Sequence, residues 1–219
     1  MSRTLEPLSG TLEHNKMLSN TVNDALESAE TLAARLRQER SGLKIAATDR
    51  NWLSAACFDQ AFEYHKAIIL LVRQSLFGAA LALVRPMFEI YIRGVWIGQC
   101  ASDAELEKLR KDRIDKKFHQ IMKEIESHDS GNISLRAKVT GNFKDAMNDF
   151  IHGGRLQLMR RLTGNAFAPN YPANEIVETI DFVSAICLLS EWELVLLAGR
   201  KDIATSLLDE MKARGIFAD

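Results

Sequence analysis

The sequence predicts an all-α protein, a single-domain bundle of about seven or eight helices. Apolar residues recur every three or four positions along most of the 219 residues, the period of helices that bury one face. The 4 prolines and 12 glycines fall mainly between these apolar runs, where they end helices. No repeat, low-complexity tract or linker divides the chain. Residues 1–219 are therefore expected to form one domain, with roughly the first ten residues frayed.

Three helices are predicted at about residues 18–41, 51–74 and 75–101. The third is the longest mainly apolar stretch, and it contains Pro86. Because proline has no N–H to donate, a kink is expected there. Gly94 and Gly98 lie one turn apart, which would let another helix approach closely.

Five further helices are predicted at about residues 102–128, 135–152, 155–162, 175–199 and 202–214. Ser102 and Glu105 have the spacing of a capping box, so a helix should begin there. The stretch 182–189 is apolar on all sides, which is typical of a helix at the centre of a bundle. Gly215 is expected to end the last helix.

Composition excludes several classes of protein. The net charge of −1 gives no overall attraction to nucleic acid or to an acidic membrane, so any such surface must be local. The most apolar region is interrupted by charges and is too short to span a bilayer, so no membrane association is expected. Cys57, Cys100 and Cys187 are far apart and fit small core residues of a cytoplasmic protein.

Several catalytic motifs are absent from the sequence. It has no glycine-rich nucleotide loop, no HEXXH, no Glu-x-x-His pair and no GxSxG turn. We therefore expect neither a metal nor a cofactor.

Arg85, Glu89 and Arg93 follow one another at intervals of four, which places them on one stripe of the third helix. Two interpretations remain open. The three residues can form an ion ladder that holds neighbouring helices in register, or the two arginines can form the wall of a polar pocket, oriented by Glu89.

A second polar stripe lies in the segment MNDFIHGG, where Asn148, His152 and Arg155 are spaced four and three apart. A histidine titrates near neutral pH and can transfer protons, while an arginine can hold a phosphate. Arg160 and Arg161 add positive charge nearby. His152 can instead cap its own helix, with the arginines solvated, so an anion or RNA-phosphate site is one of two interpretations.

Three segments, LVRPMFEIYIRGVW, NDFIHGGRLQLMRR and PNYP before an apolar helix, resemble uncharacterised bacterial all-helical proteins that are similar to the HEPN group. The resemblance covers about residues 76–197. It implies helical-bundle domains that commonly dimerise, many of them metal-independent ribonucleases of toxin–antitoxin and phage-defence systems, others binders of nucleotides or RNA.

The HEPN signature is an arginine, often followed by a polar residue, with a histidine after four to six intervening positions. By resemblance, His152 matches the histidine and Asn148 the polar position, whereas Met147 stands where the arginine belongs. Arg85, Arg93 or Arg155 would have to replace that arginine in space. Arg113 and His119 also satisfy the spacing formally.

The leading functional hypothesis is an HEPN-like protein that binds or cleaves RNA. His152, Arg155 and Asn148 would be catalytic, and Arg85, Arg93, Glu89 and Arg160 would bind the phosphate or ligand. The alternatives are a non-catalytic interaction module, as a homodimer or with a partner protein, and a binder of a small anionic ligand.

Overall fold

The computed structural model describes residues 18–111, 113, 116–128, 154–163, 166–167 and 169–216. Eight helices and two short strands form in these residues: α1 (Asn20–Arg40), α2 (Asp49–Arg73), α3 (Phe77–Gln99), α4 (Asp103–Arg110), α5 (Phe118–His128), α8 (Arg155–Met159), β1 (Leu162–Thr163), β2 (Ala166–Phe167), α9 (Ala173–Leu197) and α10 (Lys201–Ala213). The all-α prediction is confirmed.

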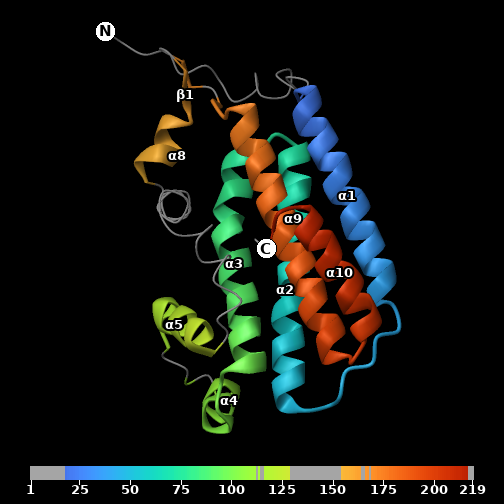
Figure 1. The fold of residues 1–219 in the computed structure, drawn as a ribbon. Helices are drawn as coiled ribbons and strands as arrows, with labels where there is room; N and C mark the ends of the chain where they lie inside the picture. Colours follow the sequence, from blue (N-terminus) through green and yellow to red (C-terminus); the bar gives the residue numbers. More distant parts are fainter. Residues whose placement is uncertain are drawn as a thin grey trace.

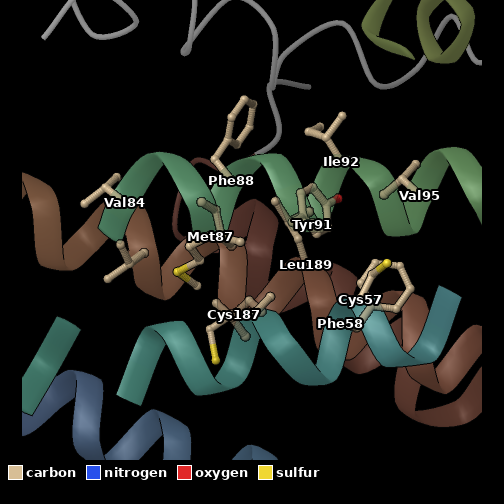
Figure 2. Close-up of a cluster of buried hydrophobic side chains, with 14 of the residues drawn as sticks. Cys57, Phe58, Val84, Met87, Phe88, Tyr91, Ile92, Val95, Cys187 and Leu189 are labelled. Carbon is tan, nitrogen blue, oxygen red and sulfur yellow. The ribbon is translucent and has the colours of Figure 1, made fainter. Parts of the chain in front are cut away.

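The long helices form a bundle around α9. Figure 1 shows α9 in the middle of the bundle, and it packs against α1, α2, α3 and α10. Side chains are buried on every side of α9, including Ile180, Val183, Leu188 and Val195. The prediction of a central helix here is therefore confirmed. Figure 2 shows Cys187 and Leu189 of this helix in the apolar cluster that α3 also lines.

The closest contact in the bundle is between α2 and α3. A Cβ atom added at Gly94 would lie 2.7 Å from a ring carbon of Phe58 and 2.9 Å from the Cβ of Cys57. One turn on, a Cβ at Gly98 would lie 3.0 Å from the hydroxyl of Ser54. That hydroxyl donates to the Gly94 carbonyl at 2.8 Å. The two glycines thus allow the close helix approach that their spacing predicts.

The prediction of one continuous helix over residues 102–128 is wrong. The capping box at Ser102 and Glu105 is present, but α4 ends at Arg110 and α5 begins at Phe118. Lys116, in the connection, forms ion pairs with both Glu105 and Glu124, and its ammonium lies 4.7 Å from the centre of the Trp96 ring. A straight helix would separate Lys116 from Glu105 by about 16 Å, so these tertiary contacts require a break.

The region before α9 also differs from expectation. The helix predicted at residues 155–162 ends at Met159, and the two-residue strands β1 and β2 pair antiparallel after it. α9 begins at Ala173 with Pro172 as its N-cap, which agrees with the start predicted near residue 175. Gly215 follows α10 with a φ of 66°, which suits a glycine that ends a helix. The helix predicted at residues 135–152 lies outside the described residues.

Candidate functional site

The predicted arginine stripe on α3 contains one ion pair. The Nε of Arg85 donates to Oε1 of Glu89 at 2.6 Å, and their side chains are 28% and 36% exposed. Both residues belong to α3, so this pair does not itself connect α3 to a neighbouring helix.

The pair leaves part of the Arg85 guanidinium available. Glu89 accepts only from Nε, and within the described part of the chain no hydrogen bond or ion pair engages either terminal nitrogen of Arg85. A guanidinium fixed at one edge can present two parallel N–H groups to an oxyanion. Such a geometry suits bidentate recognition of a phosphate or carboxylate.

Arg93 lies two turns after Arg85 and is partly buried. Among the residues that the structure describes, it makes no hydrogen bond or ion pair. Its charge lowers the pKa of the Cys57 thiol, although burial has the larger effect and raises that pKa to about 11. Arg93 therefore lies towards α2, still as an uncompensated cation within the described ranges.

The two arginines at the ends of α8 differ in their surroundings. Arg155 is exposed at the first position of α8. Arg160, at the end of this helix, forms an ion pair with Glu175 in the first turn of α9. The Arg160 carbonyl accepts from the backbone of Asn170 at 2.8 Å.

Tyr171 ties the end of α8 to the start of α3. Burial raises the pKa of its hydroxyl, and the charges of Arg161 and Arg160 lower it, so both arginines lie near the ring. The ring packs against Phe77 at 5.4 Å between centroids, and a Cβ added at Gly78 would lie 2.8 Å from the Tyr171 oxygen. Gly78 precedes Arg85 by seven residues on the same face of α3, a rise of about 10 Å.

The C-terminal end of α8, with Arg160 and Arg161, thus lies near the start of α3, about 10 Å along the helix from Arg85. No hydrogen bond or ion pair between described residues joins Arg155 or Arg160 to Arg85, Glu89 or Arg93. Asn148 and His152, the other two predicted site residues, lie outside the described residues.

Sequence analysis missed a second polar region, which is buried between α1, α2 and α9. His65 of α2 is 2% exposed, and Glu191 of α9 is 0% exposed. Arg40 at the end of α1 donates to Oε2 of Glu191 at 3.0 Å, and its guanidinium lies 3.4 Å from the centre of the Phe62 ring. Glu191 follows Val183 and Cys187 on one face of α9, and this spacing was the only signal of a buried carboxylate.

Burial shifts the pKa values of both groups. It lowers the pKa of His65 to about 4, so the imidazole is neutral at pH 7. It raises the pKa of Glu191 to about 7, although the charge of Arg40 opposes this. Within the described residues, His65 Nε2 and Glu191 Oε1 have no hydrogen-bond partner.

Two kinds of feature are not found in the part of the chain that the structure describes. No group of three or more His, Cys, Asp or Glu side chains is arranged to hold a metal ion. None of the described helices combines the length and apolar character needed to cross a bilayer.

A protein family described as a family of unknown function, DUF6988, matches residues 58–214. The chain belongs to this family. The part matched to DUF6988 runs from α2 to α10 and includes the stripe on α3, His65 and Glu191, whereas α1 precedes it. No curated protein and no solved structure matches the chain.

Proposed function

We propose that the protein binds RNA at the α3 stripe and acts as an HEPN-like protein of a prokaryotic defence or toxin-type system, as a cytoplasmic homodimer. The observation that carries the proposal is the state of Arg85. Its guanidinium is held by Glu89 through Nε alone, is partly exposed, and has two terminal nitrogens without a partner in the described residues. An arginine in this state can donate two parallel hydrogen bonds to two oxygens of one phosphate.

Further support comes from the charge around Arg85. Arg93 lies on the same stripe without an ion pair to any described residue, and Arg160 and Arg161 approach the start of α3 through Tyr171. The acidic and basic residues of the whole chain nearly balance, so a local group of arginines is where a phosphate backbone would be attracted.

Cleavage at this site proceeds by attack of a ribose 2′-hydroxyl on the adjacent phosphorus. The new 2′-O–P bond closes a cyclic phosphate, and the P–O5′ bond breaks to release a 5′-hydroxyl. His152 takes the 2′ proton or supplies the proton to the leaving oxygen, while Arg85 and Arg155 stabilise the charge on the phosphorane.

The architectural alternative, a ladder that joins helices, has less support. An ion pair within one helix contributes about 0.3–0.5 kcal/mol when exposed, and the Arg85–Glu89 pair lies entirely within α3. A non-catalytic interaction module therefore has to rest on other surfaces.

Replacement of Arg85 by alanine should weaken binding of single-stranded RNA about tenfold or more, because a hydrogen bond to a charged group contributes about 1.5–3 kcal/mol. The slope of log affinity against log salt should also become shallower by about 0.7 for each phosphate that the variant no longer neutralises. Fluorescence anisotropy with a labelled mixed-sequence RNA measures both quantities.

Arg214→Ala provides the control: Arg214 also donates from Nε to a carboxylate four residues away, at 3.0 Å from Glu210 on α10, but its Nη2 pairs with that carboxylate as well, at 2.8 Å. This variant should bind RNA like the wild type. Equal affinities for wild type and Arg85→Ala, or equally weakened binding in the two variants, would contradict the proposal.

A further inference from the structure

A cleft of about 540 Å³ lies between α1 and α2, and none of its lining residues belongs to α3. Its volume is within the range of about 300–1,000 Å³ that is usual for small-molecule sites. α1 and α2 form its walls, and Cys187 of α9 contributes to the base.

The base of the cleft contains a buried polar group that lacks a partner. His65 lines the cleft, is 2% exposed, and has an Nε2 that bonds to no described residue. This nitrogen is itself shielded from solvent, so His65 contributes a polar group beneath the surface of the cleft. A neutral imidazole can accept a hydrogen bond or donate one.

Arg40 lines the same cleft and has donors to spare. One terminal nitrogen bonds to Glu191, and no bond from the other nitrogens to a described residue is present. The guanidinium also stacks on Phe62, which fixes its plane at the cleft wall. Burial raises the pKa of Glu191, which weakens the compensation of the Arg40 charge by this carboxylate.

The rest of the lining divides into an apolar wall and a balanced rim. Ala33, Phe62 and Ile69 provide apolar surface. Among the exposed lining residues, Arg73 is paired with Glu30, and the cations Arg37 and Lys66 are equal in number to the anions Asp59 and Glu63. Arg40 is thus the cation of the cleft that would attract an anion, and it lies beside the apolar wall.

We propose that the α1–α2 cleft binds a small organic anion with an apolar body, whose acid group is held by Arg40 and whose body packs on Phe62 and Ile69. Neither the α3 stripe nor RNA is required for this binding. The ligand class is an aromatic or aliphatic carboxylate or sulfonate, because these combine an oxyanion for Arg40 with a body for the apolar wall.

The test compares two probes that differ by one group. 1-Anilinonaphthalene-8-sulfonate carries an anion on an apolar body, and N-phenyl-1-naphthylamine has the same body without the sulfonate. Fluorescence titration of the full chain should give one site for the sulfonate, with an affinity at least tenfold higher than that for the neutral probe. Arg40→Gln should remove this preference.

Two further variants separate the cleft from other apolar surface. Ala34, an exposed residue of α1, lines the cleft, whereas Ser28 is exposed on the same helix and does not. Ala34→Trp should fill the cleft and abolish binding of both probes, and Ser28→Trp should leave binding unchanged. Circular dichroism checks that each variant is folded.

Equal affinity for the charged and neutral probes would overturn the proposal. Undiminished sulfonate binding by the folded Ala34→Trp variant would overturn it as well. Neither result depends on the RNA measurements, so this proposal and the proposed function fail separately.

Discussion

Replacement of Glu191 by glutamine should make the protein markedly less stable as the pH falls from about 6.5 to 4, and more stable than the wild type above pH 7. The folded-state pKa of Glu191, about 7, is higher than its ordinary value of 4.5. The folded protein therefore holds an extra proton between these values, and Glu191 destabilises it progressively as the pH rises through that window. Glutamine removes this effect, so the variant keeps only the loss of stability with falling pH that His65 causes.

Replacement of His65 by leucine should have the opposite effect. The pKa of His65 is lowered from 6.5 to about 4, so the unfolded chain binds the extra proton and stability is lost as the pH falls through that window. In the wild type the two slopes nearly cancel between about pH 4.5 and 6.5. Each variant retains one of the two slopes, and a shift of about 2.5 pKa units changes the free energy of unfolding by at most roughly 3.4 kcal/mol.

The charged groups around Glu191 are present in both variants, although only Glu191→Gln removes the ion-pair partner of Arg40. Arg40, Glu39 and Arg35 of α1 all influence its pKa, and Cys187 lies one turn before it on α9. Urea unfolding of the wild type, the two single variants and the double variant from pH 4 to 8 measures the slopes. Differences between variants cancel the acid-labile ion pairs that all four proteins share, such as that of Glu105, whose pKa Lys116 lowers to about 2. Parallel stability curves would show that neither side chain is buried as described.

Replacement of His152 by alanine should slow RNA cleavage by a factor of about 10² to 10⁴, the usual contribution of a general acid or base. Rates are measured on a mixed RNA pool without added metal, and the products should end in cyclic phosphates.

His119→Ala is the informative control for this measurement. His119 is exposed on α5 and, with Arg113, forms an arginine–histidine pair that satisfies the HEPN spacing formally. The His119→Ala substitution should leave the rate of RNA cleavage unchanged. A His152→Ala enzyme that cleaves as fast as the wild type would refute the catalytic role, and a loss confined to His119→Ala would transfer that role to the other pair.

Local features of the fold are predictable from the sequence because they depend on neighbouring residues. The capping box at Ser102 and the close approach at Gly94 are of this kind, as is the central position of α9. The end of α4 at Arg110 is different. It depends on Lys116 reaching Glu105, Glu124 and Trp96, contacts that only the tertiary structure creates.

The two candidate sites differ in how far the sequence predicts them. The stripe of Arg85, Glu89 and Arg93 is predictable because helical spacing alone aligns it. The buried group of His65, Arg40 and Glu191 was missed because its members come from three helices that are remote in the sequence. Spacing within one helix carries no information about such a convergence.

The central claim is that Arg85 and His152 act on the same RNA phosphate, and a double-mutant cycle tests it most directly. RNA affinity is measured for the wild type, Arg85→Ala, His152→Ala and the double variant. Residues that share a ligand group couple by about 0.5–3 kcal/mol, whereas distant residues are additive to within about 0.5 kcal/mol. We predict a coupling of at least about 1 kcal/mol. Additive effects of the two substitutions, or unchanged affinity in either single variant, would contradict a shared site.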